Sequence, residues 1–222
     1  MSSDHQPLNM DRAQRVLVHT SEMEWEKSPA PGVWRKKLER AAAESGQVTS
    51  VVRYEAGSTF EQHVHPLGEE IFVLDGVFAD ENGEYPAGSY LRNPPGSRHA
   101  PRSPDGCELF VKLDQFDPGD RETVCVQTRA GEWQPGLVPG LRVMPLHSFG
   151  VEHTSLVRWE PGTVFKTHTH PGGEEIFVLE GVFEDEAGAY GPGSWLRNPA
   201  WSRHAPFSRE GCTILVKTGA LR

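Results

Sequence analysis

The chain contains an internal duplication, and this repeat constrains the fold more than any other feature of the sequence. Residues 52–112 align with residues 157–217 without an insertion, and 38 of these 61 positions are identical. A repeat of this length indicates two copies of one structural unit, each with its own core. We therefore expect two domains of the same fold within the 222 residues.

Each repeat has the pattern of an all-β unit built from short strands. Apolar, β-branched runs such as Glu69–Leu74 alternate with turns, and the chain has 23 glycines and 18 prolines. Asp80–Glu84 is expected to form a hairpin turn, because its Asn-Gly pair can supply positive φ angles. Lys36–Glu44 contains good helix formers. We nevertheless expect a strand followed by a loop there, because the counterpart Arg142–Phe149 contains Pro145.

Three histidines and one glutamate recur at the same places in both repeats. His63 and His65 are two residues apart, so on a strand they project from one face, and Glu69 opens the next strand where it can join them. His99 follows from a later strand, after a Pro-Pro-Gly turn. The predicted ligand sets are His63, His65, Glu69 and His99 in the first repeat and His168, His170, Glu174 and His204 in the second. Such a set binds a divalent transition metal, zinc or iron, and we expect one ion per domain.

A structural role for these residues is the alternative interpretation. An isolated pair of histidines is more often hydrogen-bonded within the fold or exposed on the surface than bound to a metal. Here all eight ligand-type residues keep their register, while neighbours such as Val64 and Thr169 differ between the repeats. A purely structural barrel has no reason to keep them, so metal binding is the preferred interpretation.

The segments around these ligands resemble the two motifs of the cupin superfamily. Gly57–Gly76 and Gly162–Gly181 fit the first motif. Gly88–His99 fits the second motif, as does Gly193–His204 except that Trp201 replaces its glycine. The resemblance implies a bicupin, with two tandem double-stranded β-helix, or jelly-roll, barrels related by pseudo-twofold symmetry. More narrowly, the motif neighbourhoods are similar to the cupin domain of ChrR, a zinc-binding anti-sigma factor, and to acetylacetone-cleaving oxygenases.

Four segments are expected along the chain. Residues 1–18 form a polar tail, 19–114 the first cupin domain, 115–122 a Pro-Gly-containing linker, and 123–222 the second cupin domain. A faint echo of Trp25 in Trp133 indicates that the duplication also includes the leading strands.

Arg92 and Arg197 are the possible pocket residues besides the ligands. Arg92 precedes the metal turn, where it could contact an anionic ligand or form a structural ion pair with a carboxylate. Glu70 directly follows the predicted ligand Glu69 on the strand, so its side chain faces the opposite side of the sheet. We expect Glu70 to be a solvated acid or an acid at the rim of the barrel. Tyr54 and Trp159 differ between the repeats, so the two pockets need not bind the same molecule.

The composition excludes several classes of protein. The net charge is −9 and no basic stripe is present, which argues against a direct nucleic-acid partner. No apolar run approaches a membrane span and no signal peptide is visible, so we expect a cytoplasmic protein without a membrane partner. The three cysteines are interpreted as reduced thiols.

Two functions from different classes remain open. The ChrR resemblance implies a metal-bound regulatory protein that responds to a small molecule or an oxidant. The separate sigma-binding domain of that family has no match here, so a sigma factor is not expected as a partner. The alternative is an iron(II)-dependent cupin dioxygenase that cleaves a carbonyl compound such as a β-diketone. Either activity would come from the metal and a small-molecule ligand or substrate, and a free barrel edge would permit a homo-oligomer.

Overall fold

The computed structural model describes residues 6–221 and divides the chain into two compact units. The first contains the described part of Met1–Met10 together with Met23–Ala130. The second contains Asp11–Glu22 together with the described part of Gly131–Arg222. The regular secondary structure of the described residues consists of β-strands and two short 3₁₀ helices, η1 (Thr20–Glu22) and η2 (Thr128–Ala130). The all-β prediction is therefore confirmed, and no helix among residues 6–221 is long and apolar enough to cross a membrane.

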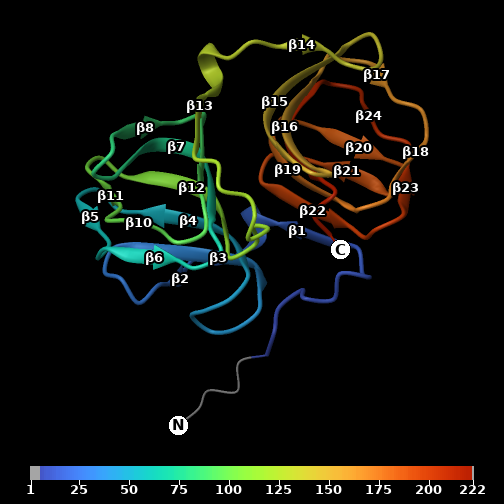
Figure 1. Cartoon of the computed structure of the whole chain (residues 1–222). Helices are drawn as coiled ribbons and strands as arrows, with labels where there is room; N and C mark the ends of the chain where they lie inside the picture. Colours follow the sequence, from blue (N-terminus) through green and yellow to red (C-terminus); the bar gives the residue numbers. More distant parts are fainter. Residues whose placement is uncertain (1–5, 222) are drawn as a thin grey trace. The chain divides into compact units, whose positions relative to one another are not determined.

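The first unit consists of one large sheet and a separate ladder that carries three of the predicted metal ligands (Figure 1). Its strands are β2 (Glu26–Lys27), β3 (Val33–Arg40), β4 (Val48–Tyr54), β5 (Ser58–Thr59), β6 (His63–His65), β7 (Glu69–Ala79), β8 (Glu84–Pro86), β9 (Ser89–Asn93), β10 (Ser97–His99), β11 (Arg102–Ser103), β12 (Cys107–Leu113) and β13 (Val124–Gln127). The main path of the sheet is β13-β9-β7-β12-β4-β3-β2, and β6 pairs with β10 in the separate ladder.

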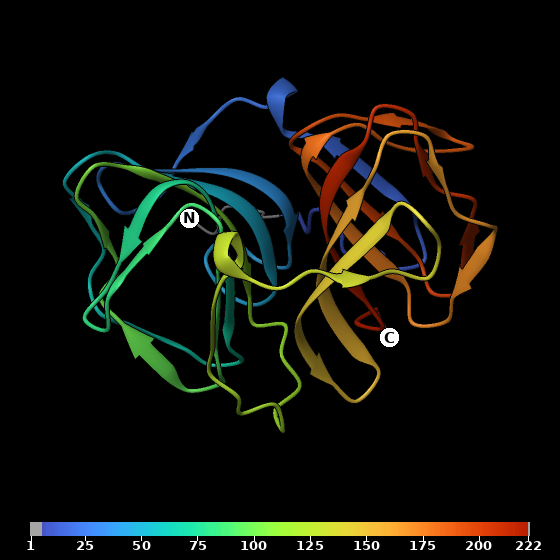
Figure 2. The same ribbon diagram turned by 90° about the horizontal axis from the view of Figure 1, so that it is seen from above.

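The second unit repeats this topology with one exception. Its strands are β1 (Val16–His19), β14 (Gln134–Pro135), β15 (Leu141–Phe149), β16 (Glu152–Trp159), β17 (Thr163–Val164), β18 (His168–His170), β19 (Glu174–Gly181), β20 (Phe183–Asp185), β21 (Gly188–Tyr190), β22 (Ser194–Asn198), β23 (Ser202–His204), β24 (Phe207–Ser208) and β25 (Cys212–Thr218). The main path is β1-β22-β19-β25-β16-β15-β14, and β18 pairs with β23. The exception is that the counterpart of β7 is divided into two strands, β19 and β20, and β20 joins β17, β21 and β24 in a separate four-stranded sheet. In Figure 2 the strands of each unit curve round into a barrel.

Each main sheet ends in a strand from the other half of the sequence. β1 precedes the first repeat but pairs with β22 of the second unit, with Val16 opposite Arg197. β13 precedes the second repeat but pairs with β9 of the first unit, with Val124 opposite Arg92. Figure 1 shows the blue β1 alongside the orange-red β22. The equivalent registers indicate that β1 and β13 are copies of one strand that have exchanged places.

The structure divides the chain at other points than the expected boundaries. Residues 11–22, expected as the tail and the start of the first domain, belong to the second unit, because the apolar run that begins Val16–His19 forms a sheet edge there. The expected linker 115–122 belongs to the first unit, where Phe116 and Asp120 are buried. Residues 1–5 of the expected tail lie outside the described residues.

Each unit has its own apolar core, and the strand that begins with the predicted glutamate ligand runs through it. In β7 the side chains of Ile71 and Val73 are buried in the core cluster, on the same strand face as Glu69. The equivalent cluster of the second unit contains Ile176 and Val178. Burial of each such side chain contributes about 1.5–3 kcal/mol. The packing that stabilises the barrel therefore also fixes the position of the carboxylate.

The glycine that closes the first motif is required by a close approach of two backbones. Gly76 and Gly181 both have a φ angle of 69°. A Cβ atom at Gly76 would lie 2.1 Å from the carbonyl oxygen of Gly106, and one at Gly181 would lie 2.0 Å from that of Gly211. These positions exclude every side chain, which explains why the motif ends on glycine in both halves.

Candidate metal centres

The predicted ligands of the first unit converge. The short strand β6 presents His63 and His65, β7 begins with Glu69, and β10 ends with His99, which lies opposite His63 in the ladder. The Nε2 atoms of His65 and His99 are 3.1 Å apart. Oε2 of Glu69 is 3.5 Å from Nε2 of His65 and 3.4 Å from Nε2 of His99. Two ligand atoms at about 2.1 Å from one ion lie about 3.0–3.4 Å apart at octahedral or tetrahedral angles, so the donor set fits a shared metal ion.

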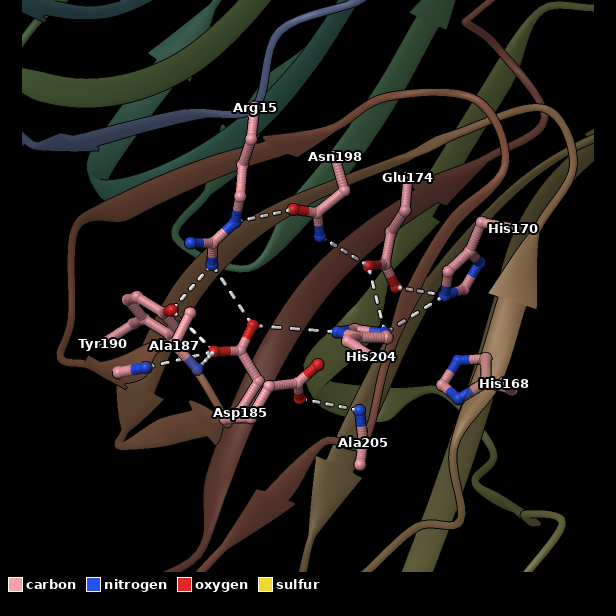
Figure 3. Close-up of polar contacts among 12 residues, drawn as sticks. Arg15, His168, His170, Glu174, Asp185, Ala187, Tyr190, Asn198, His204 and Ala205 are labelled. Carbon is pink, nitrogen blue, oxygen red and sulfur yellow. Dashed lines mark hydrogen bonds and ion pairs between the residues drawn. The ribbon is translucent and has the colours of Figure 1, made fainter.

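The second unit has the same arrangement (Figure 3). Nε2 of His170 on β18 is 3.1 Å from Nε2 of His204 on β23. The two carboxylate oxygens of Glu174 lie 3.4 Å from His170 Nε2 and 3.5 Å from His204 Nε2. His168 completes the triad, and the ligand atoms of each histidine triad lie within 4.8 Å of one another. All eight predicted ligands therefore come together, four in each unit.

Backbone carbonyl groups select the tautomer of one histidine in each triad. Nδ1 of His63 lies 2.8 Å from the carbonyl oxygen of Glu61, and Nδ1 of His168 lies 3.2 Å from that of Lys166. A carbonyl oxygen only accepts hydrogen bonds, so Nδ1 is the protonated nitrogen in both residues. This leaves the lone pair of Nε2 free for a metal, the outer-sphere arrangement usual for metal-bound histidine.

An aspartate stands behind the last histidine of each triad. Nδ1 of His99 is 3.3 Å from Oδ2 of Asp80, and Nδ1 of His204 is 3.8 Å from Oδ2 of Asp185. Burial disfavours ionisation of Asp185, but its interactions with His204 and Tyr190 outweigh burial and lower its pKa to about 2. Asp185 is therefore a carboxylate at neutral pH, and its negative charge helps to raise the pKa of His204 despite the burial of that histidine.

In the second unit an arginine from the exchanged segment joins this outer sphere (Figure 3). Nδ2 of Asn198 donates to Oε2 of Glu174 at 3.1 Å, and Nε of Arg15 donates to Oδ1 of Asn198 at 3.0 Å. The Nη2 of Arg15 also donates to Asp185 at 3.2 Å and to the hydroxyl of Tyr190 at 2.6 Å. Arg15 thus connects to both the glutamate and the last histidine, each through one residue.

Among residues 6–221, no equivalent of this arginine contacts the first centre. Asn93 donates to Oε2 of Glu69 at 2.9 Å, as its counterpart does in the second unit. The residue that precedes β13, however, is Thr123, where Arg15 precedes β1. The sequence analysis did not identify Arg15. The signal that could have found it is the similarity of Val16–His19 to Val124–Gln127.

Each centre opens on an apolar pocket. In the first unit a cavity of about 160 Å³ is lined by His63, His65 and Glu69 together with core residues such as Phe60. In the second unit His168 and Glu174 line a cavity of about 170 Å³ with apolar walls. His168 and His170 also border a neighbouring cavity of about 730 Å³. The ligands therefore form part of the wall of a space that a small molecule could enter.

The two arginines predicted as possible pocket residues, Arg92 and Arg197, line none of these three cavities. Arg92 is fully buried and pairs through Nη1 with Glu70 at 3.2 Å and through Nη2 with Asp120. Arg197 is also fully buried, and its Nη2 donates to the carbonyl oxygen of Asp11 at 2.9 Å. The structure thus shows the ion-pair alternative for Arg92. Glu70 is buried against Tyr90 and Arg92 rather than solvated, because β7 is covered on both faces.

Several solved structures are similar to this structure over most of the chain. A proposed dioxygenase from Nostoc punctiforme has a TM-score of 0.79 at 16% identity and covers 94% of this chain and 84% of its own. A mutant of Bacillus subtilis oxalate decarboxylase has a TM-score of 0.64 at 15% identity, with 93% and 77% covered. A Cupin 2 conserved barrel domain protein from Leptotrichia buccalis has a TM-score of 0.64 at 13% identity, with 95% and 98% covered. At these identities the likeness shows the shared cupin fold alone.

No curated protein matches the sequence. The model of the ChrR Cupin-like domain family matches it twice, over residues 13–117 and 121–222. Each match contains one complete ligand set and one copy of the exchanged strand. The expectation of a duplicated cupin is therefore confirmed, and the chain belongs to the ChrR cupin-like family.

Proposed function

We propose that the chain is a metal-dependent bicupin that binds a small organic molecule beside each metal, and that it acts as an iron(II)-dependent dioxygenase on a carbonyl compound. The observation that supports this is the position of the ligands. In the first unit His63, His65 and Glu69 are wall residues of the apolar cavity. A structural metal site is closed by its protein ligands, whereas a catalytic site keeps coordination positions for a substrate.

The protein residues have separable roles in this proposal. His63, His65, Glu69 and His99 would hold the metal of the first unit, and the equivalent residues that of the second. A bound iron(II) ion supplies the redox chemistry by which dioxygen reacts with an organic substrate. Asn93 and Asp80 orient the glutamate and the last histidine. The apolar walls exclude water and hold the hydrocarbon part of the substrate.

Elemental analysis of protein purified without oxygen, combined with oxygen-consumption measurements, tests this function. We expect iron in both centres and oxygen uptake that depends on a substrate from a panel of β-diketones and aromatic ketones. Zinc without any oxygen uptake would contradict the dioxygenase. Protein that binds no transition metal, even after reconstitution, would contradict every metal-dependent function.

A ligand-responsive regulatory role is the second candidate. The match to the ChrR Cupin-like family, together with the pockets beside the ligands, favours it. In this case a small molecule would bind at a redox-inert metal and change the interactions of the protein without being consumed. Zinc content, together with a ligand recovered unchanged after binding, would support this role over the dioxygenase.

A further inference from the structure

The pockets of the two units differ in charge at one position of the sheet. In the first unit Arg35 lines the cavity, and it lies on β3 opposite Val52. The same position in the second unit is Val143, which lines its cavity and lies opposite Val157, the repeat equivalent of Val52. The second cavity therefore presents aliphatic carbon where the first presents a guanidinium group.

Arg35 is held in the wall of the first cavity by an exposed carboxylate. Its Nη1 and Nη2 donate to Oε2 and Oε1 of Glu44, both at 2.9 Å. The arginine side chain is 14% exposed and the glutamate side chain 55% exposed. Nε of Arg35 is buried and has no hydrogen-bond partner among the described residues. This paired geometry is the one by which arginine recognises a carboxylate, and here the partner is the more accessible group.

Glu44 belongs to a loop that is longer than its counterpart in the second unit. Residues 41–47 connect β3 to β4, whereas only two residues separate β15 from β16. The interval from Trp25 to His63 is three residues longer than that from Trp133 to His168, and β15 and β16 each extend one residue further into the turn than β3 and β4 do. The extra residues thus lie where they bring a carboxylate to the mouth of the first cavity.

Arg40 fixes this loop in place. Its side chain is 3% exposed, and its Nε donates to the carbonyl oxygens of Ala42 at 2.9 Å and Ala43 at 2.8 Å. The Nη2 of Arg40 lies 3.4 Å from Oε2 of Glu44. The loop backbone can therefore remain anchored through Arg40 while the exposed Glu44 side chain moves away from Arg35.

We propose that Arg35 binds the carboxylate of a small organic acid in the first unit, and that Glu44 occupies this anion position until the acid displaces it. The hydrocarbon part of the acid packs against the apolar walls, in the same cavity as the metal ligands His63 and His65. The second cavity, with Val143 in place of the arginine, selects an uncharged ligand. The inference rests on the proposed function, because it assigns a ligand class to the same site.

Titration calorimetry on the full, metal-loaded chain tests this inference with hexanoate and hexanamide, which differ in the carboxylate. We expect the wild-type protein to bind hexanoate more tightly than hexanamide. Arg35→Val, which introduces the residue of the second unit, should weaken hexanoate binding about tenfold or more, because it removes a charge-assisted pair. Glu44→Gln should strengthen it about two- to fivefold, the range for loss of one exposed ion pair.

Arg53→Val is the matched control, because Arg53 lies on the neighbouring strand β4, pairs with Glu108 at 2.7 Å and does not line the cavity. It should leave hexanoate binding unchanged. Hexanoate affinity that is equal in the wild-type protein and in Arg35→Val would overturn the inference, since the carboxylate would then bind elsewhere. If Arg35→Val does not fold, a Glu44→Gln variant that binds hexanoate no more tightly than the wild type overturns it instead. Protein that binds no metal would contradict the proposed function. The preference for hexanoate over hexanamide can still be measured in such metal-free protein, so the two failures are distinguishable.

Discussion

Trp201 shows how one substitution alters a motif without altering the fold. It replaces the glycine of the second motif, and it adopts a φ angle of 65°, close to the 84° of Gly96 at the equivalent position. Residues other than glycine rarely adopt this left-handed backbone conformation, which costs them about 1–2 kcal/mol. Trp201 is 73% exposed, so packing of its side chain contributes little to offset that cost.

Trp201→Gly should therefore stabilise the protein against unfolding by about 1 kcal/mol. The reciprocal change Gly96→Ala should destabilise it by a similar amount, because a Cβ atom at Gly96 contacts nothing within 4 Å and only the backbone strain remains. Chemical denaturation of the two variants measures both effects. A Trp201→Gly variant that is no more stable than the wild type would show that the strain is compensated elsewhere.

Arg15 should matter for one metal centre only. Residues that orient metal ligands typically account for about 10–100-fold in metal affinity. We expect Arg15→Ala to weaken the second centre about tenfold, because Asn198 and Asp185 lose their shared donor. Competition with a chelator measures the metal affinity in a His65→Ala background, in which only the second centre is expected to bind metal. Thr123→Ala, the matched change beside the first centre, should have no effect on either.

At the residue scale, sequence reasoning succeeded where geometry is local. His63 and His65 share a strand face because of the two-residue period, and the repeat identified their partners. Arg15 and Arg35 could not be predicted in the same way. Arg15 lies beside a strand that pairs with a segment distant in the sequence, and Arg35 pairs with a residue of a loop that is longer in the first unit than in the second. Arg92, which does lie near the motif, forms a buried ion pair instead.

At the scale of elements, the exchanged strand β1 predicts a selective effect of truncation. A chain that begins at Met23 lacks β1 and Arg15, so the hydrogen-bonding edge of β22 is exposed. Amide hydrogen exchange should accelerate in Ser194–Asn198 and remain slow in the equivalent Ser89–Asn93, which still pairs with β13. Equal protection of both strands in the truncated chain would contradict the prediction that pairing with β1 protects β22.

Strands and turns were predictable from local patterns, but their partners were not. Val16–His19 is apolar and β-branched like a strand, yet its composition does not determine which sheet it joins, and its polar surroundings led to the expectation of a tail. Lys36–Glu44 was predicted as a strand followed by a loop, and β3 does end at Arg40. The hairpin at Asp80–Glu84 is also present, but Asn82 and Gly83 are not among the residues with positive φ, so its turn type was predicted wrongly.

At the scale of the whole molecule, the two centres should lose their metal independently. Each ligand set comes from one unit, without a shared residue. His65→Ala should therefore remove the metal of the first unit only, His170→Ala that of the second only, and the double variant both. Elemental analysis of the three proteins measures this. A double variant that retains the metal content of the wild type would refute the ligand sets.

The exchange of β1 also sets an order of events during synthesis. The segment 16–19 emerges from the ribosome roughly 175 residues before its partner 194–198, a delay of roughly 9–35 s at typical rates of translation. β13, in contrast, follows its partner β9 closely, so the first unit can close as soon as it is made. Throughout the delay the β1 segment is an unpaired strand open to other chains. The second unit is thus the last to mature, and nascent chains crowded on one messenger are most vulnerable to mispairing through this segment.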